Sequence, residues 1–165
     1  IDMLNDFMDP KGVLFCGEAV RRIIPAVKEK IEEFRRLNQP VIYACDAHDP
    51  QDEEFKAFPR HCIRDGWGAE VIPELAPEEG DLVVHKTRFD AFLGTELEGL
   101  LRKLSVTEVC LTGVCTSICV MDTAAGAFFR GFEVTVFKEA VGDFDPEAHA
   151  FALKRMERIY RAQVL

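Results

Sequence analysis

Three side chains of different chemistry follow stretches that we expect to be strands: the carboxylate of Asp2, the ammonium of Lys86 and the thiol of Cys119. The dipole at the amino end of a helix favours the thiolate form of a cysteine, and a nearby ammonium adds to this effect. A carboxylate can take the thiol proton and later return it to a departing amine. Together these residues predict covalent catalysis at a carbonyl carbon, with cysteine as the nucleophile.

Each of these residues also has a more ordinary interpretation. A single cysteine in an apolar stretch is usually a small buried side chain, and a single lysine is usually a solvated surface charge. Asp6 is a weaker alternative to Asp2, because an aspartate in a turn commonly accepts hydrogen bonds from backbone N–H groups. The shared position of Asp2, Lys86 and Cys119 at the ends of strands favours the catalytic interpretation.

A second polar group combines Asp46 and His48, which stand at the end of another expected strand, with His61 further along the chain. One carboxylate and two imidazoles can hold a divalent cation, Zn²⁺ or else Mn²⁺ or Fe²⁺, with open coordination positions. The alternative is that these side chains are only hydrogen-bonded or exposed in a loop-rich region. The sequence indicates no organic cofactor.

Hydrophobic periodicity indicates the elements that must position these residues. Apolar residues at three- and four-residue steps predict a helix from Glu18 to Leu37. The stretch from Ala47 to Glu79 lacks a sustained period, so we interpret it as a long functional loop with room for one short helix. The other expected elements are strand Pro40–Cys45, strand Asp81–His85, helix Thr95–Leu104, strand Glu108–Thr112, helix Ile118–Phe129, strand Glu133–Phe137 and helix Pro146–Arg161.

Strands and helices that alternate in this way predict a three-layer α/β/α fold with a mostly parallel open sheet. In such sheets ligands bind beyond the carboxyl ends of the strands, where Asp2, Asp46, Lys86 and the turn from Gly113 to Cys119 should meet. We expect residues 1–165 to form a single domain. Because Ile1 and Asp2 resemble the end of a strand, we also expect the first strand to be truncated in this sequence.

Composition narrows the choice of partners. The 165 residues carry a formal net charge of −9, which would repel nucleic acid or an anionic membrane, so we expect a small-molecule partner. The six cysteines include no metal-type Cys-x-x-Cys pair, and we expect reduced thiols in a cytoplasmic protein. No apolar run approaches the roughly 18 residues of a membrane span.

Six segments of the chain resemble, in this order, motifs of the isochorismatase-like cysteine hydrolases. That superfamily includes nicotinamidase (pyrazinamidase), N-carbamoylsarcosine amidohydrolase and isochorismatase. The resemblance covers the chain from Ile1 to about Asp145. The segments are Ile1-Asp2-Met3-Leu4-Asn5-Asp6-Phe7, Asp46-Ala47-His48, Phe58-Pro59-Arg60-His61-Cys62, Gly66-Trp67-Gly68-Ala69-Glu70, Lys86-Thr87-Arg88-Phe89-Asp90-Ala91-Phe92 and Gly113-Val114-Cys115-Thr116-Ser117-Ile118-Cys119-Val120.

The resemblance implies specific roles for several residues. It implies a catalytic triad, an oxyanion hole next to a cis peptide bond that precedes Cys115, a metal site, two aromatic rings around a flat substrate, and a homo-oligomer. In nicotinamidases, however, an aromatic residue generally stands where this chain has Ala47, and this chain has no third histidine in the loop. The residues implied are Asp2, Lys86 and Cys119 for the triad, the N–H groups of Cys115 and Cys119 for the oxyanion hole, Asp46, His48 and His61 for the metal, and Phe7 and Phe58 for the rings.

These observations predict a hydrolase that cleaves a C–N amide bond through a thioester. Nicotinamide, converted to nicotinate and ammonia, is the leading substrate, and N-carbamoyl or ureido compounds are the alternative that the missing histidine favours. Two interpretations of other classes stay open. A cation could activate water directly while Cys119 is structural, or the domain could be a non-catalytic binding or thiol-sensing protein with Cys115 and Cys119 as a redox pair.

Overall fold

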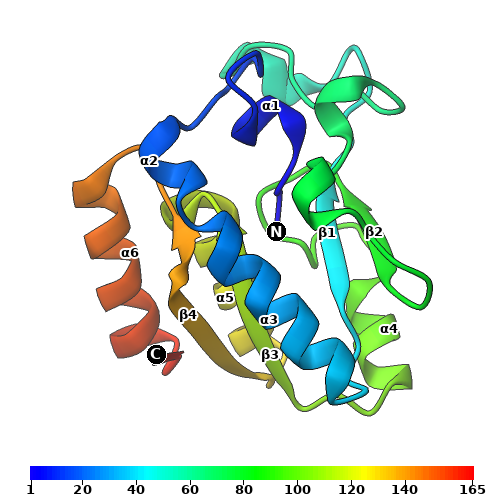
Figure 1. Ribbon diagram of the computed structural model, residues 1–165. Helices are drawn as coiled ribbons and strands as arrows, with labels where there is room; N and C mark the ends of the chain where they lie inside the picture. The colour runs from blue at the N-terminus through cyan, green and yellow to red at the C-terminus, as the bar shows by residue number, and fades with distance from the viewer.

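All strands of the protein pair in parallel (Figure 1). In the computed structural model, which describes all of residues 1–165, β1 (Ile42–Asp46) pairs with β2 (Leu82–Lys86) in one sheet. A second sheet has the order β3 (Glu108–Val114), β4 (Glu133–Gly142) and β5 (Gln163–Val164). The strands confirm the expectation of a mostly parallel α/β fold.

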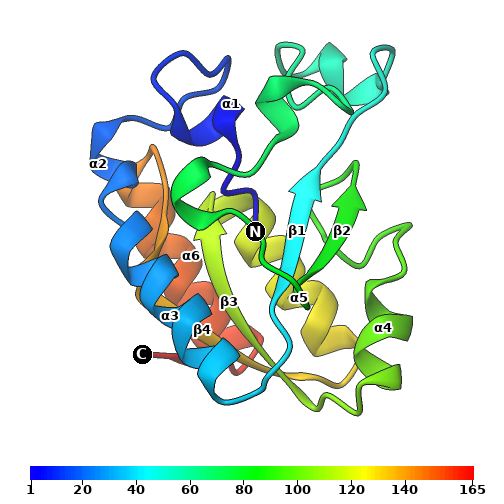
Figure 2. The same ribbon diagram turned by 45° about the vertical axis from the view of Figure 1, so that its right-hand side comes forward.

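The amino-terminal residues connect the two sheets. The carbonyl of Ile1 accepts a hydrogen bond of 3.1 Å from the N–H of Val114 in β3, and the N–H of Asp2 donates to the carbonyl of Ala44 in β1 at 2.9 Å. The chain therefore begins between β1 and β3, as the label N in Figure 2 shows. This placement puts Asp2 next to the carboxyl end of β1.

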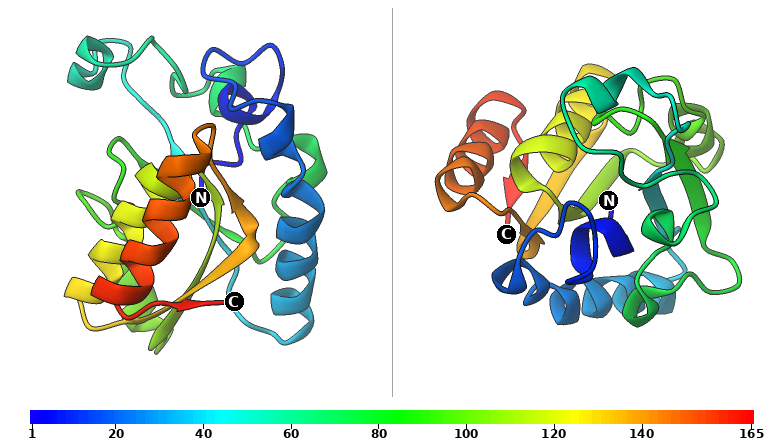
Figure 3. Two further views of the ribbon diagram at one scale, coloured as in Figure 1. Left: turned by 90° about the vertical axis from the view of Figure 1, so that its left-hand side faces the viewer. Right: turned by 90° about the horizontal axis from the view of Figure 1, so that it is seen from above.

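Helices cover both faces of the strands and complete three layers (Figure 3). On one face lies α3 (Ile24–Arg36), and on the other lie α5 (Met121–Phe129) and α6 (Pro146–Ile159). α4 (Leu97–Lys103) contributes to the same hydrophobic cluster as α5 and α6, whereas α3 contributes to a second cluster. β1 is therefore buried from both sides, which explains its continuous apolar run, whereas Val83 and His85 of β2 are exposed. No helix has the combination of length and apolar character needed to cross a membrane.

The helix expected from Glu18 to Leu37 is interrupted. It consists of α2 (Glu18–Arg21) and α3, and Pro25 occupies the first turn of α3. A proline has no N–H to donate to the carbonyl four residues earlier, so the helix cannot run through this position without a break. β5 and the short α1 (Asn5–Met8) were not predicted, because elements of two and four residues carry no periodic signal.

The carboxyl ends of β1, β2 and β3 lie at the same end of the molecule (Figure 2). The amino-terminal segment with α1 and the loop between β1 and β2 cover this end. That loop contains three 3₁₀ turns, η1 (Glu53–Lys56), η2 (Trp67–Ala69) and η3 (Pro73–Leu75), rather than one short helix. After β3 the chain enters a π-helical turn, η4 (Thr116–Val120), which leads directly into α5.

Candidate active site

Lys86 is the centre of a buried polar cluster at the carboxyl end of the strands. Its Nζ lies 2.7 Å from Oδ2 of Asp2, 2.5 Å from Oδ1 of Asp46 and 3.6 Å from Sγ of Cys119. All four residues are buried, and they come from the amino-terminal segment, β1, β2 and η4. The three residues predicted as a triad therefore lie together. Asp46, predicted only as a metal ligand, also contacts the ammonium.

The ammonium and the carboxylates of this cluster shift one another's pKa values. Burial lowers the pKa of Lys86, but the negative charges of Asp2, Cys119 and Asp46 outweigh burial and raise the pKa well above its ordinary value. Lys86 is therefore an ammonium ion. Burial, together with the charge of Asp46, raises the pKa of Asp2, while Lys86 opposes this rise. Asp2 consequently holds a proton more readily than an ordinary aspartate, which suits a group that must accept and return one.

The thiol of Cys119 differs from the expectation of a helix-stabilised thiolate. Burial raises its pKa well above the ordinary value; Lys86 opposes this rise, and Asp2 and Asp46 add to it. Cys119 lies in η4, the first turn of the helical segment that continues into α5, so its place near a helix amino end agrees with expectation and burial is what opposes the thiolate. The thiol is protonated at neutral pH and needs a base in order to act as a nucleophile.

Asp2 is placed to be that base. A carboxylate oxygen of Asp2 lies within 4.8 Å of the sulfur of Cys119. Oδ2 lies 2.7 Å from the ammonium of Lys86, whereas Oδ1 accepts a hydrogen bond of 2.9 Å from the N–H of Asp46. One oxygen therefore fixes the side chain against β1, and the other pairs with the same ammonium that contacts the sulfur of Cys119. Asp6 is not at this site.

Asp6 has the structural use that its position in a turn predicted. Its side chain accepts hydrogen bonds of 2.7 Å from the N–H of Cys62 and 3.2 Å from the N–H of Val13. These bonds connect the amino-terminal segment to the long loop between β1 and β2. Gly68 packs against this carboxylate so closely that an added Cβ would lie 2.0 Å from Oδ2. Asp6 therefore holds the loops that cover the site.

The turn that carries Cys119 is shaped by its backbone. The peptide bond between Val114 and Cys115 is cis, as the resemblance implies. The N–H groups of Ile118 and Val120 donate to the carbonyl of Cys115 at 3.1 and 3.2 Å, whereas the N–H of Cys115 itself donates to no protein group. The role of Cys115 and Cys119 N–H groups as an oxyanion hole stays a prediction, and the unused Cys115 donor is consistent with it.

Only glycine fits at the start of this turn. Gly113 has φ of 111°, and a Cβ there would lie 2.0 Å from the carbonyl oxygen of Ile1. From the other side, Oδ2 of Asp143 accepts a hydrogen bond of 2.7 Å from the N–H of Ser117. His149, in the first turn of α6, places Nδ1 2.9 Å from Oγ1 of Thr116. Residues from the loop before α6 and from its first turn thus brace the turn that carries Cys119.

The three residues predicted as metal ligands also lie together. Oδ2 of Asp46 is 3.7 Å from Nε2 of His48 and 3.9 Å from Nε2 of His61. Nδ1 of His48 lies 3.2 Å from Oδ2 of Asp52, and Nδ1 of His61 lies 2.7 Å from the carbonyl of Pro59. Because each Nδ1 has an oxygen partner, each Nε2 can present a lone pair to a cation.

Two observations indicate that a divalent cation fits this cluster. Nε2 of His48 is buried without a hydrogen-bond partner, which is costly unless something else binds it. In addition, Oε1 of Glu54 lies 3.8 Å from Nε2 of His48 and 3.8 Å from Nε2 of His61. Two imidazoles and two carboxylates are a common donor set for Zn²⁺, Mn²⁺ or Fe²⁺.

Glu54 is the functional candidate that the sequence interpretation missed. Glu54 stands in the acidic run Asp52-Glu53-Glu54, where one glutamate cannot be distinguished from another by type. The structure distinguishes them. The η1 turn, capped by Asp52, directs Glu54 inward with its side chain 8% exposed, whereas Glu53 points outward with 73% exposed.

A cavity of about 370 Å³ adjoins this cluster, and Asp2, Cys119 and the metal-site residues Asp46 and His61 line it. The two aromatic residues predicted to surround a substrate, Phe7 and Phe58, also line it. Their ring centroids lie 5.6 and 6.4 Å from that of His61. The cavity therefore joins the nucleophile, the possible metal site and the predicted aromatic walls.

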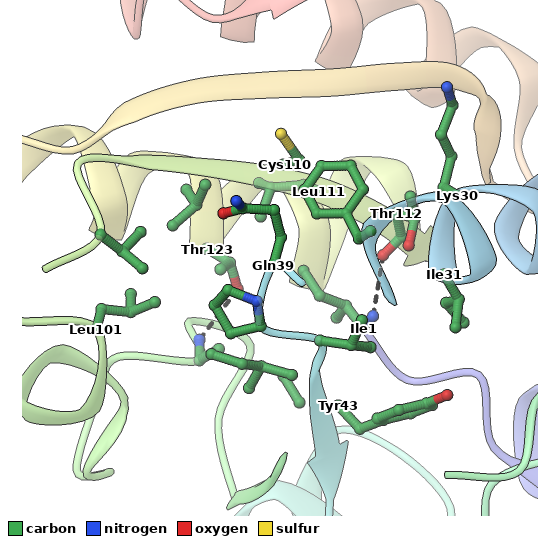
Figure 4. A pocket seen from close by; sticks show the side chains of 18 of the residues that line it. Ile1, Lys30, Ile31, Gln39, Tyr43, Leu101, Cys110, Leu111, Thr112 and Thr123 are labelled. Atoms are coloured by element: carbon green, nitrogen blue, oxygen red, sulfur yellow. Dashed lines mark hydrogen bonds between the residues drawn. The ribbon is translucent and has the colours of Figure 1, made fainter. Parts of the chain in front are cut away.

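A larger cavity of about 630 Å³ lies elsewhere, between the two sheets (Figure 4). Ile1, Tyr43 and Leu111 line it, and the amino group of Ile1 donates to the carbonyl of Thr112 there. Neither Lys86 nor Cys119 lines this cavity, and most of its walls are apolar. Size alone would favour this larger cavity as the substrate site. The candidate catalytic residues instead line the smaller cavity at the carboxyl ends of the strands.

Solved structures of named hydrolases are similar to this chain over nearly its full length. Nicotinamidase/pyrazinamidase PncA from Bacillus subtilis is 36% identical, with a TM-score of 0.94 and coverage of 99% of this chain and 94% of that chain. N-carbamoylsarcosine amidase from Thermoplasma acidophilum is 35% identical, with a TM-score of 0.90 and coverage of 99% and 91%. Pyrazinamidase of Pyrococcus horikoshii, in complex with zinc, is 32% identical, with a TM-score of 0.92 and coverage of 99% and 94%.

The family model described as the isochorismatase domain matches residues 1–164. This match confirms the resemblance that the six segments indicated. The similar structures agree with the mostly parallel α/β fold. The chain belongs to the isochorismatase family of hydrolases.

Proposed function

We propose that this protein hydrolyses the carboxamide of a small, uncharged aromatic molecule, with nicotinamide as the leading substrate. The observation that carries the proposal is the contact of one buried ammonium, Lys86, with Asp2, Asp46 and Cys119. A buried lysine between two carboxylates and a thiol is costly to assemble and adds little to stability that apolar residues could not supply. Such an arrangement is typical of a catalytic site.

The reaction follows from the positions of these groups. Asp2 accepts the thiol proton of Cys119, and the sulfur attacks the amide carbonyl to form a tetrahedral intermediate. The N–H groups of Cys115 and Cys119 bind its oxyanion. Asp2 then gives its proton to the departing nitrogen, so that ammonia leaves and a thioester remains. Asp2 next activates a water molecule, which releases the carboxylic acid and restores the thiol.

Lys86 keeps this sequence of proton transfers possible. The ammonium lies next to both Asp2 and the sulfur, so it stabilises the negative charge whichever of the two carries it. Asp46 accepts a hydrogen bond from the same ammonium and fixes its direction. Lys86 does not need to transfer a proton, and its raised pKa is consistent with a permanent charge.

The same Asp46 connects the triad to the possible metal site. Oδ1 faces Lys86, whereas Oδ2 faces His48 and His61. We propose that a divalent cation is held by Asp46, His48, His61 and Glu54. When bound, the cation supplies a Lewis-acid contact for a lone pair of the substrate. The residues that would hold the cation and the sulfur of Cys119 line the same small cavity, so one substrate molecule could contact both.

The charges in the cavity favour an uncharged aromatic amide over a carbamoyl acid. No lysine or arginine lines the cavity, while three carboxylates do, those of Asp2, Asp46 and Glu54. N-carbamoyl amino acids and ureidoacrylate carry a carboxylate, and no lysine or arginine in the wall of this cavity would pair with it. Phe7 and Phe58 instead provide apolar walls for a flat ring. Glu54 also adds a fourth candidate ligand beside His48 and His61, which weakens the argument from the missing histidine for the carbamoyl alternative.

A substrate comparison tests this proposal. We expect ammonia release from nicotinamide and pyrazinamide with kcat/KM at least about 100-fold higher than from N-carbamoyl amino acids or ureidoacrylate, because the cavity offers aromatic walls to a flat ring and no lysine or arginine to a carboxylate. Ammonia would be measured in a coupled assay with each compound. Activity on a carbamoyl compound without activity on nicotinamide would contradict the proposed substrate class.

The proposed metal site has its own prediction. Glu54→Gln should weaken Zn²⁺ binding by about tenfold or more, because a neutral amide is a poorer ligand than a carboxylate. Zn²⁺ affinity of the metal-free protein would be measured by competition with a coloured chelator. Glu53→Gln is the matched control and should bind Zn²⁺ as the unchanged protein does, since its side chain is exposed. Equal affinities for the two variants would remove Glu54 from the site.

A further inference from the structure

Two thiols outside the triad lie in contact within the wall of the candidate active-site cavity. Sγ of Cys16 is 3.6 Å from Sγ of Cys115, although the residues are 99 positions apart in sequence. All six cysteines are free thiols, and no other pair has its sulfur atoms in such contact. The sequence instead suggested Cys115 and Cys119 as a redox pair, because these two residues are close along the chain.

The backbone holds both members of this pair. The N–H of Cys16 donates to the carbonyl of Phe7 at 2.9 Å, and the thiol of Cys16 also contacts the carbonyl of Leu14. Cys115 is held by the bonds that Ile118 and Val120 make to its carbonyl. The segment before α2 and the turn before α5 therefore keep the two sulfur atoms facing each other.

The pair is reachable from the active-site cavity. Cys16 and Cys115 both line the cavity of about 370 Å³ together with Cys119, although each is at most 8% exposed overall. A small reagent that enters as a substrate does can therefore meet these sulfur atoms. Cys62 does not line this cavity, and its thiol faces the carbonyl of Gly68.

We propose that Cys16 and Cys115 form a redox-modification site that a small oxidant, such as a peroxide, converts to a disulfide. With hydrogen peroxide as the oxidant, one thiol attacks a peroxide oxygen, becomes a sulfenic acid and releases water. The second thiol then displaces the sulfenic hydroxyl as a second water molecule and forms the S–S bond. Two thiols are oxidised by two electrons, and one peroxide is reduced to two waters. The sulfur atoms must approach by about 1.5 Å to reach bonding distance.

The disulfide would change the active site. It would connect the segment before α2 covalently to the turn that carries Cys119, and it would displace Cys115, whose N–H is the proposed oxyanion donor. A misplacement of about 1 Å can cost on the order of 100-fold in rate. This consequence for activity rests on the proposed function, whereas formation of the disulfide does not.

The test is oxidation of the full chain with diamide, followed by peptide mapping without reduction. Diamide accepts two electrons and two protons at its N=N bond, so it forms disulfides without adding a group of its own. We expect a disulfide-linked peptide pair containing Cys16 and Cys115, both in the unchanged protein and in Cys119→Ala. A Cys115–Cys119 disulfide in the unchanged protein, or free Cys16 and Cys115 after prolonged treatment, would overturn the proposal.

Activity supplies the second readout, with each variant compared with its own untreated sample. We expect the unchanged protein and the control Cys110→Ser to lose activity at least tenfold and to regain it with dithiothreitol. Cys16→Ser should keep most of its activity under the same treatment. Equal loss in Cys16→Ser would show that inactivation does not depend on the pair. If the disulfide forms but no amide is hydrolysed by any sample, the modification site stands and the proposed function fails.

Discussion

Cys119→Ala is expected to lower kcat for amide hydrolysis by a factor on the order of 10⁴ or more, with folding unaffected. In the proposed mechanism the sulfur attacks the carbonyl, so its removal should leave only the catalysis supplied by binding and the oxyanion hole. Alanine is smaller than cysteine and apolar, so the buried position tolerates it. The measurement is ammonia release under saturating substrate.

Cys110→Ala is the matched control for this variant. Cys110 lies on β3, outside the cavity that Cys119 lines, so its loss should leave kcat within a factor of two or three of the unchanged value. The rival in which a cation activates water makes the opposite prediction for Cys119→Ala, because the thiol would then be only structural. Retention of most activity in Cys119→Ala would favour that rival.

Lys86→Met is expected to have the largest effect on stability. Methionine matches the length of the side chain but removes the charge, so Asp2 and Asp46 become two buried carboxylates without a cation. Breaking a buried ion pair in this way costs about 3–5 kcal/mol in the free energy of unfolding. Urea denaturation of the variant and of the unchanged protein measures this difference. Activity should be lost as well, because the charge next to the sulfur disappears.

The pH dependence identifies the cause of that destabilisation. Lys86 lowers the pKa of Asp2, so its removal raises the pKa of this carboxyl further above the value in the unfolded chain. A carboxyl with a raised pKa in the folded state stabilises the fold when protonated, at low pH, and destabilises it as the pH rises. The stability deficit of Lys86→Met should therefore be smaller at pH 5 than at pH 8.

Lys56→Met provides the control. Lys56 pairs with Glu53 on the surface with its side chain 76% exposed, and its replacement should leave the free energy of unfolding nearly unchanged at both pH values. A pH-independent deficit in Lys86→Met, or none at all, would mean that the ammonium does not hold the two carboxylates together.

The sequence was sufficient to predict which residues meet at the candidate site. Parallel strands bring their carboxyl ends to one edge, so Asp46 at the end of β1 and Lys86 at the end of β2 lie close to each other when the two strands are neighbours. The register confirms this, because Asp46 and Lys86 are direct partners in the ladder. The apolar runs of β1 and β3 located the strands, and hence the residues that follow them.

Other features depend on three-dimensional packing and were not predictable from local patterns. Glu54 differs from Glu53 only in the direction that the η1 turn gives its side chain. The raised pKa of Cys119 reflects burial, which a dipole argument from sequence does not include. The contact of Cys16 with Cys115 joins residues from opposite ends of the chain, and no periodicity reports such a contact.

The central claim is that the sulfur of Cys119 becomes acylated during turnover, and it can be tested directly. The protein would be mixed with nicotinamide, quenched in acid during steady turnover, and examined by intact mass and peptide mapping. We predict that part of the unchanged protein carries one nicotinoyl group on the peptide that contains Cys119. Asp2→Asn should show no turnover and should carry no nicotinoyl group. A parallel sample would contain hydroxylamine, which converts a thioester to a hydroxamate. Steady ammonia release with neither an adduct on Cys119 nor a hydroxamate product would contradict a thioester mechanism.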